Sequence, residues 1–246
     1  MVSHLEEMAL NAWPALQTVL YDGWLLRQAR GYTRRANSVQ PIYSSSADLV
    51  EKVLHCERFY RGHGLDTVFK LSRDAQPAEL DELLTRRGYR AEAPTSVQTL
   101  DLAQVPVPTF APITAERELS SAWLNDLAKL NSIPDSLVPT VRKLLQSIPQ
   151  PHVFIALREG DRNIALGLGV LERGYFGLFD LVTAPEWRSQ GLGRQLTLHL
   201  LQWGKNLGAS TAYLQVQMDN KPAHRLYASL GFAEQYQYWY RVKPRD

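Results

Sequence analysis

A glycine-containing loop between an apolar strand and an amphipathic helix constrains the fold of this chain more than any other feature. Tyr175–Thr183 is apolar almost throughout, as expected of a strand covered on both faces. After the loop, helical spacing is carried by Leu192, Leu196, Leu200, Trp203 and Leu207. Gly208 is placed to end that helix. The sequence therefore predicts a buried strand that leads directly into a long helix.

Gly191 and Gly193 stand where this helix begins. A helix N-terminus presents unpaired backbone N–H groups and a partial positive charge, and glycines let a ligand approach that backbone. Arg188 and Arg194 add formal charge beside it. The pattern indicates a phosphate-binding loop. The alternative is a structural turn in which the glycines only relieve crowding.

The rest of the second half alternates between helical and strand-like segments. Helical apolar spacing is found in Glu116–Leu130, Ser136–Ser147 and Lys221–Leu230. Strand-like segments are His152–Arg158, Asn163–Glu172, Ala212–Val216 and a tail from Phe232 to Val242. This order predicts an α/β fold with a mixed, mostly antiparallel sheet flanked by helices.

Three prolines in Gln104–Pro112 mark a break in composition. Prolines lack a backbone donor and favour extended neighbours, so we interpret the segment as an interdomain connection. The expected domains are residues 1–105 and 106–246. A proline-rich loop inside one domain is the alternative.

The first half repeats the later part of the order, which indicates an internal duplication. A leading helix is expected at Leu5–Leu16. The expected strands are Gly23–Ala29, Arg35–Ile42, Thr67–Leu71 and Val97–Leu102, and the expected helices are Ala47–Arg61 and Ala78–Arg87.

Composition excludes several other classes of protein. A net charge of +2 gives no indication of a nucleic-acid partner. Cys56 is the single cysteine, so neither an intrachain disulfide nor a cysteine-rich metal site is expected, and no metal site is predicted. Neither an apolar run of membrane-span length nor a signal-type N-terminus is present. A cytoplasmic location with no membrane association is expected, and no oligomeric state is predicted.

Two motifs in order resemble those of the GNAT superfamily of N-acetyltransferases. The first is the loop Arg188-Ser189-Gln190-Gly191-Leu192-Gly193, and the second runs from Leu214-Gln215-Val216 through Asn220–Phe232. The resemblance covers roughly residues 113–242. The loop lacks both the third glycine of the dinucleotide fingerprint and the Lys-Ser/Thr pair of the Walker loop. The whole chain resembles two-domain bacterial acetyltransferases with tandem GNAT folds.

The resemblance implies transfer of an acetyl group from acetyl-CoA to a primary amine of an unidentified small molecule or peptide. It also implies site residues. The pantetheine arm would pair with the backbone of Leu181, Val182 and Thr183 and with the side chain of Asn220. The pyrophosphate would lie against Arg188, Ser189, Gln190, Gly191, Leu192, Gly193 and Arg194. Tyr227 would protonate the departing thiolate, since a positioned acid helps a thiolate to leave. A backbone N–H near Val182 is placed to stabilise the oxyanion.

Each of the two downstream residues also has a structural interpretation. Asn220 precedes Lys221-Pro222 and is a good N-cap residue, a role that can coexist with ligand binding. Tyr227 lies among apolar residues at helical spacing and would serve equally as a core tyrosine.

The general base is not evident from the sequence. Side chains alternate along a strand, so Gly177, Phe179 and Leu181 share the face on which the superfamily often carries its base. Asp180 points to the other face unless a β-bulge shifts the register. Asp180 is the candidate, and Glu172, Glu234 and His224 are weaker ones. A non-catalytic acyl-CoA-binding regulator is therefore the alternative function.

The first half is interpreted as a copy that has lost acyl-CoA binding. Aligning Arg87-Gly88-Tyr89 with Leu230-Gly231-Phe232 places Pro77 at Asn220 and Leu84 at Tyr227. Tyr43–Ser46 supplies no glycine pair before the helix. The cationic stretch Arg30–Asn37, with Arg34 and Arg35, either lines an acceptor pocket that prefers acidic substrates or is a solvated loop.

Overall fold

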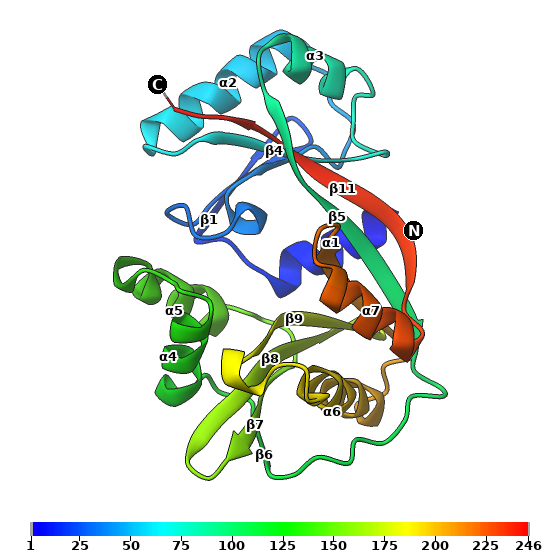
Figure 1. Ribbon diagram of the computed structural model, residues 1–246. Coiled ribbons are helices and arrows are strands. Elements are labelled where there is room, and N and C mark those ends of the chain that lie inside the picture. Colours follow the sequence, from blue (N-terminus) through cyan, green and yellow to red (C-terminus); the bar gives the residue numbers. More distant parts are fainter. Residues whose placement is uncertain (1, 246) are drawn as a thin grey trace. The chain divides into compact units, whose positions relative to one another are not determined.

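Eleven strands and seven α-helices alternate along the computed structural model, which describes residues 2–245 (Figure 1). The predicted class is confirmed: the protein is α/β, with a mixed, mostly antiparallel sheet flanked by helices. Two compact units divide the chain. The N-terminal unit is Met1–Ser96 with Tyr236–Asp246, and the C-terminal unit is Val97–Gln235. Strands β5 (Arg90–Asp101) and β11 (Ala233–Lys243) therefore each contribute residues to both units.

In the N-terminal unit the strands follow the order β1-β2-β3-β4-β11-β5. Their bounds are Gln17–Tyr21, Trp24–Gln28, Val39–Gln40 and Thr67–Ser72 for β1 to β4, Arg90–Asp101 for β5 and Ala233–Lys243 for β11. The helices of this unit are α1 (Val2–Ala12), α2 (Leu49–Gly62) and α3 (Leu80–Arg86). The strands that flank α2, β3 and β4, run parallel, whereas β4 and β11 run antiparallel.

The predicted strand Arg35–Ile42 is largely wrong. The structure has a 3₁₀ turn at Arg34–Ala36 and only the two-residue strand β3. A local turn explains the difference, because the N–H groups of Ala36 and Asn37 donate to the carbonyls of Thr33 and Arg34. The Asn37 side chain fixes this turn by accepting from the N–H groups of Ala29 and Gly31 and donating to the carbonyls of Tyr32 and Thr33. These backbone groups are satisfied locally rather than by a ladder. The edge strand β1, which is mostly exposed and shows no alternation, was not predicted.

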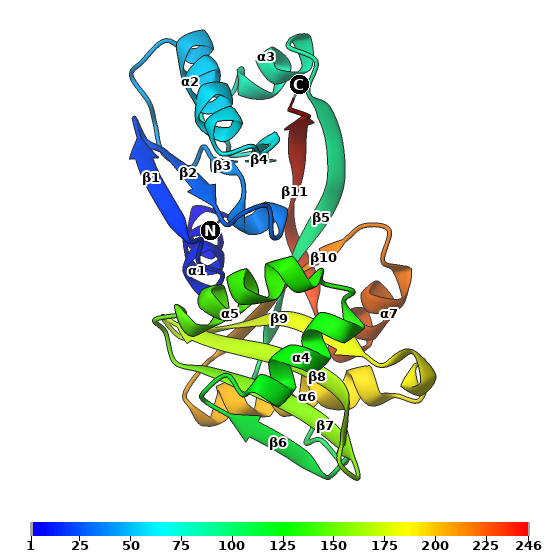
Figure 2. The same cartoon turned by 90° about the vertical axis from the view of Figure 1, so that its left-hand side faces the viewer.

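In the C-terminal unit the order is β5-β10-β9-β8-β7-β6; β9 and β10 pair in parallel, whereas β6 to β9 pair antiparallel with one another in sequence order. Figure 2 shows α4 and α5 crossing one face of this sheet, with α6 behind it. The strands β6 to β10 are Ile113–Glu116, His152–Glu159, Arg162–Glu172, Tyr175–Thr183 and Thr211–Gln217. The helices α4 to α7 are Ser121–Leu130, Val138–Gln146, Leu192–Asn206 and Lys221–Leu230.

The helix predicted over Glu116–Leu130 begins later than expected. Ser120 caps α4 by accepting from the backbone N–H of Trp123, and the preceding residues Ile113–Glu116 pair with β7 as an edge strand. The cap residue sets the start of the helix because its side chain satisfies an otherwise unpaired donor.

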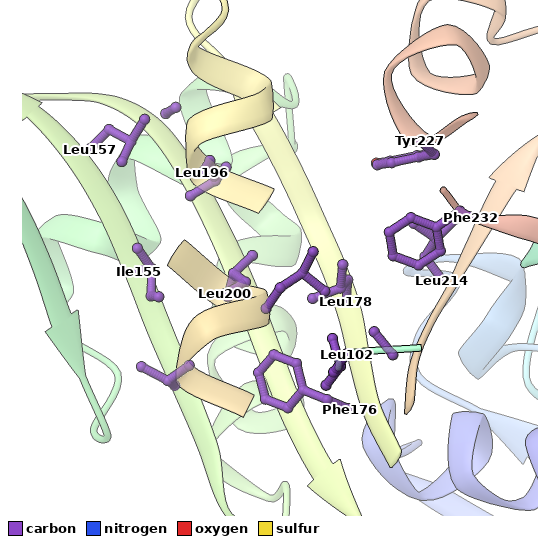
Figure 3. Close-up of a cluster of buried hydrophobic side chains, with 14 of the residues drawn as sticks. Leu102, Ile155, Leu157, Phe176, Leu178, Leu196, Leu200, Leu214, Tyr227 and Phe232 are labelled. Carbon is purple, nitrogen blue, oxygen red and sulfur yellow. The ribbon is translucent and has the colours of Figure 1, made fainter. Parts of the chain in front are cut away.

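The core of the C-terminal unit lies between α6 and the sheet (Figure 3). Phe176 of β9 is fully buried there. A Cβ atom added at Gly169 of β8 would lie 2.1 Å from the Phe176 ring, and one added at Gly204 of α6 would lie 2.4 Å from it. The two glycines therefore make the space that lets α6 pack closely against β8 and β9.

The proline-rich segment is bound along α6 and lies inside the C-terminal unit. The Gln195 side-chain oxygen accepts from the backbone N–H groups of Thr109 and Phe110, at 2.8 and 3.0 Å. His199 Nε2 lies 2.7 Å from the Phe110 carbonyl oxygen, and Lys205 donates to the carbonyl of Ala103. This segment is thus fixed to the helix that follows the glycine loop.

Candidate functional site

A cavity of about 630 Å³ opens between the end of β9, the glycine loop and α7. Its walls come from three stretches of the C-terminal unit. They are Leu181–Thr183, then Trp187–Ser189 with Gly191–Arg194 and Leu196, and finally Asn220, Pro222, Ala223, Leu226 and Tyr227. The volume falls within the range of small-molecule and cofactor sites. Residues from both sequence motifs therefore line one cavity.

The first wall is the end of β9, whose edge on the β10 side has no pairing strand within the part of the chain that the structure describes. Pairing between β9 and β10 covers Tyr175–Leu178 and Thr211–Leu214, and stops there although both strands continue. Leu181, Val182 and Thr183 lie beyond this point and line the cavity. An extended ligand arm could add to this stretch of β9 as a peptide adds to a sheet edge.

A β-bulge interrupts β9 at Asp180. Leu166 pairs with Val182 and Leu168 pairs with Phe179, so two β9 residues stand opposite one β8 residue, Gly167. Asp180 has φ of +51°. A bulge changes which face the following side chains occupy. Simple alternation therefore does not apply across Asp180, whose side chain is half-buried and does not line the cavity.

The glycine loop presents an uninterrupted run of backbone donors. Among the described residues, the N–H groups of Ser189–Arg194 have no hydrogen-bond acceptor, and no side chain caps α6. Gly191 and Ser189 both have left-handed φ, +79° and +60°. Such turns of successive N–H groups form an anion-binding nest at a helix N-terminus.

Two arginines make this wall cationic. Arg188 and Arg194 line the cavity, and neither has a carboxylate partner within the part of the chain that the structure describes. Arg188 Nε donates to the Thr183 carbonyl at 3.2 Å, which fixes the side chain beside β9. Gln190 differs from its neighbours: its amide donates to the Glu186 carbonyl, and its side chain does not line the cavity.

Asn220 caps α7, as its sequence context suggested. Its Oδ1 accepts from the backbone N–H of Ala223 at 3.2 Å. The cap uses only the side-chain oxygen, so the Nδ2 donors remain for a ligand carbonyl. Capping and lining the cavity therefore coexist at this residue.

Tyr227 is both a packing residue of the core and a residue of the cavity wall. It is 8% exposed, and its ring packs against Phe232 at 5.7 Å between centroids, at the margin of the core (Figure 3). It also lines the cavity, and its hydroxyl has no hydrogen-bond partner within residues 2–245. Burial raises the pKa of Tyr227 to about 12. The phenol is therefore fully protonated near neutral pH, the state required of a proton donor.

The other residues that the sequence singled out as candidates for the base or the acceptor pocket do not line this cavity. Both ring nitrogens of His224 lie within hydrogen-bond distance of protein groups, and Glu172 lies 3.4 Å from Arg173. Arg34 pairs with Glu92 inside the N-terminal unit. Arg35 lies over the ring of Trp13 at 4.7 Å. Glu234 is exposed.

Five residues of the cavity wall were not predicted from the sequence: Trp187, Leu196, Pro222, Ala223 and Leu226. A signal for some of them was available, because Ala223, Leu226 and Tyr227 are spaced to share one face of a helix.

The equivalent turn of the N-terminal unit is filled by a side chain of the protein itself. There α2 also joins two parallel strands, β3 and β4. The carboxylate of Asp22 accepts from the backbone N–H groups of Ser46 and Ala47, at 3.0 and 2.9 Å, and from the ammonium of the fully buried Lys52 at 3.0 Å. The N–H groups before α6 thus remain available to a ligand, whereas those of Ser46 and Ala47 before α2 are already bound by Asp22.

We expect an Asp22→Asn variant to be less stable than the wild type at pH 7. The Ala47 N–H, followed by the Lys52 ammonium, holds the pKa of Asp22 well below its usual value of 3.8. A depressed pKa contributes stability above the unfolded-state value, and this is lost as pH falls through the folded-state value. The difference in melting temperature should therefore shrink below about pH 4. Asp74→Asn, at an exposed aspartate, is the control. An equal effect of both changes at pH 7 would contradict the role given to Asp22.

Comparison with known proteins identifies the family. Residues 1–241 match the family described as "Probable histone acetyltransferase Rv0428c C-terminal". The uncharacterized N-acetyltransferase YobR of Bacillus subtilis is 30% identical over an alignment of 248 positions, gaps included, that covers 98% of this chain and 98% of YobR. The chain belongs to the GNAT superfamily. This GNAT protein is accordingly an acyltransferase.

Solved structures support the fold of this GNAT enzyme. A GCN5-related N-acetyltransferase from Kribbella flavida superimposes with a TM-score of 0.75 at 16% identity, covering 100% of this chain and 96% of that one. A tandem GNAT protein from the clavulanic acid biosynthesis pathway gives 0.62 at 13% identity, covering 98% and 89%. No helix within residues 2–245 combines the length and apolar character needed to cross a membrane. Nor do the described residues include a group of His, Cys, Asp or Glu side chains placed to hold a metal ion.

Proposed function

We propose that this GNAT enzyme transfers an acetyl group from acetyl-CoA to a primary amine, with the donor bound in the cavity beside the glycine loop. The observation that carries the proposal is the run of available N–H groups at Ser189–Arg194, flanked by Arg188. A pyrophosphate is an anion that such a nest suits. Similarity to the Bacillus subtilis relative, an uncharacterized N-acetyltransferase, supports an amine as acceptor.

The remaining walls suit the rest of acetyl-CoA. The pantetheine arm is a chain of amides, and the proposed partners for it are the β9 edge from Leu181 to Thr183 and the Nδ2 of Asn220. Apolar side chains of Leu192, Leu196 and Leu226 surround the same cavity. The cavity therefore matches acetyl-CoA in charge, in hydrogen-bonding groups and in apolar surface.

When bound, acetyl-CoA supplies the acyl group as an activated thioester. The cavity brings donor and amine together, which removes most of the entropic cost of their encounter. Backbone N–H groups of β9 near Val182 are proposed to stabilise the negative charge that develops on the carbonyl oxygen. Tyr227 donates its phenolic proton to the departing sulfur, and its raised pKa keeps that proton in place until it is needed.

Asp180 is the proposed base for the attacking amine. It is the carboxylate at the β9 bulge, one residue before the strand edge assigned to the pantetheine arm. A half-buried carboxylate at this position can take the amine proton directly or through a water molecule.

Calorimetry and a thioester-cleavage assay test this function together. Acetyl-CoA should bind, and CoA should be released faster when a suitable primary amine is present than in buffer alone. A panel of small amines and peptides with free α- or ε-amino groups would then identify the acceptor class. Absence of acetyl-CoA binding would contradict the proposed donor, and binding without amine-dependent release across the panel would contradict the proposed acceptor.

Titration of the full chain should show one acetyl-CoA bound per molecule. The N-terminal unit repeats the order strand, helix, parallel strand, but its turn before α2 has Asp22 on the N–H groups of Ser46 and Ala47. Leu84 stands at the position aligned with Tyr227 and is fully buried. A stoichiometry of two, measured by calorimetry, would show that the N-terminal copy keeps a donor site.

A further inference from the structure

His224 is held by two other elements of the C-terminal unit, although it does not line the cavity. Its Nε2 lies 3.1 Å from the carbonyl oxygen of Gln217, the last residue of β10. The same oxygen accepts from the backbone N–H of Asn220 at 3.0 Å. A carbonyl oxygen only accepts hydrogen bonds, so Nε2 carries the hydrogen.

The second ring nitrogen completes the connection. His224 Nδ1 lies 3.3 Å from the side-chain amide nitrogen of Gln98 on β5. In the neutral ring with hydrogen on Nε2, Nδ1 is an acceptor, and the Gln98 amide nitrogen is a donor. Gln98 is 7% exposed, so this contact is largely shielded from water. The imidazole thus joins α7 to the end of β10 and to β5.

The other contacts of α7 are apolar: Tyr227 belongs to the core of the C-terminal unit, and Ala223, Leu226 and Leu230 pack against that core. Tyr227 is its one buried residue, and the remaining residues of the helix are exposed or half-buried. Asn220 lies four residues before His224 and Tyr227 three residues after it, and at these spacings side chains share one side of a helix. The residues proposed to bind acetyl-CoA and to protonate its thiolate are therefore placed on either side of His224, whose ring makes the polar side-chain contacts of α7 with β5 and β10 within residues 2–245.

We infer that His224 is a positioning residue for the donor site, holding the first turn of α7 so that Asn220 and Tyr227 keep their places on the cavity wall. The inference rests on the proposed function, because it concerns binding of acetyl-CoA. His224 acts through the backbone of α7 and takes no part in proton transfer: its two nitrogens already contact Gln217 and Gln98.

Three single variants and one double variant separate positioning from mere stabilisation. His224→Ala removes both hydrogen bonds, and we expect the Kd of acetyl-CoA to rise about 10-fold, with a further loss in kcat. His224→Gln keeps an amide nitrogen able to reach the Gln217 carbonyl, so its Kd should stay within about 3-fold of the wild type. Gln98→Leu removes one of the two bonds and should give an intermediate Kd. The double variant Gln98→Leu/His224→Ala should have nearly the same Kd as His224→Ala alone, because His224→Ala already removes the contact between His224 and Gln98.

Binding is measured by calorimetry, separately from turnover and from melting temperature. A His224→Ala variant that melts earlier but keeps the wild-type Kd and kcat would overturn the inference and leave His224 a structural residue. Should His224→Ala fail to fold, the Gln98→Leu and His224→Gln variants carry the same comparison, and a wild-type Kd in Gln98→Leu would count against the inference. A wild-type protein that does not bind acetyl-CoA would overturn the proposed function, and this inference with it.

Discussion

A Gly191→Val variant should bind acetyl-CoA more than about 100-fold more weakly than the wild type while remaining folded. Gly191 has φ of +79°, a conformation that β-branched residues strongly disfavour. Relaxing it would turn the neighbouring N–H groups away from the pyrophosphate. Two lost charge-assisted hydrogen bonds, at about 1.5 kcal/mol each, correspond to more than 100-fold in affinity. A Cβ at Gly191 would meet no atom within 4 Å, so the substitution introduces no clash with the core.

The same helix offers a matched control at its other end. Gly208 follows α6, has φ of +87°, and a Cβ there would also meet nothing within 4 Å. Gly208→Val should therefore carry a comparable backbone strain without touching the nest. Calorimetry on both variants decides the matter, with circular dichroism as the check on folding. Equal loss of affinity in the two would trace the effect to general destabilisation, and retained affinity in a folded Gly191→Val protein would remove the pyrophosphate from this loop.

The second large effect is expected at Tyr227. Tyr227→Phe should lower kcat by about 10²-fold and leave the Kd of acetyl-CoA nearly unchanged, because the ring against Phe232 stays and only the proton donor is lost. Steady-state rates and calorimetric affinities measure the two quantities separately. Since burial raises the pKa of Tyr227 to about 12, the wild-type rate should show no loss of this acid between pH 8 and pH 10. An ordinary tyrosine, with a pKa near 10, would already be half ionised at the upper limit.

Tyr89→Phe is the control for removing a buried phenol as such. Tyr89 is 3% exposed, lies in the N-terminal unit and donates to Glu57. Its loss should affect stability and leave the rate constant unchanged. If Tyr227→Phe keeps the wild-type kcat with the best amine, Tyr227 is a packing residue and another group protonates the thiolate.

Local patterns predicted the C-terminal unit well. Tyr175–Thr183 and Lys221–Leu230 have the predicted bounds, because an almost entirely apolar strand and a capped amphipathic helix are each determined by adjacent residues. The glycine loop was found for the same reason. Its six available donors follow from residues that are consecutive in the chain.

Features that depend on distant residues were not predictable in this way. The bulge at Asp180 arises from pairing with β8, where Gly167 stands alone opposite two residues. Asp22 is more than twenty residues from Ser46 and Ala47 in the sequence, and no feature of Tyr43–Ser46 predicts that this carboxylate accepts from their N–H groups. The turn at Arg34–Ala36, which the Asn37 side chain holds, likewise replaces part of the strand that the residue pattern favoured.

The compact units also depend on long-range pairing. Three prolines form the clearest break in composition, yet the segment that contains them is bound to α6 by Gln195 and His199. In the N-terminal unit, β11 lies between β4 and β5 and completes the sheet. Its residues Tyr238–Lys243 pair with Thr67–Ser72 of β4. No local property of either strand indicates that partner.

That pairing sets an order of events during synthesis. A ribosome adds on the order of 5–20 residues each second, and domains generally fold as their residues emerge. All residues of the C-terminal unit, up to Gln235, are translated before the β11 residues that pair with β4. The N-terminal unit must therefore wait with β4 lacking its β11 neighbour, while the C-terminal unit already has its full set of residues. Although most of its residues are made earlier, the N-terminal unit is the later of the two that can finish folding.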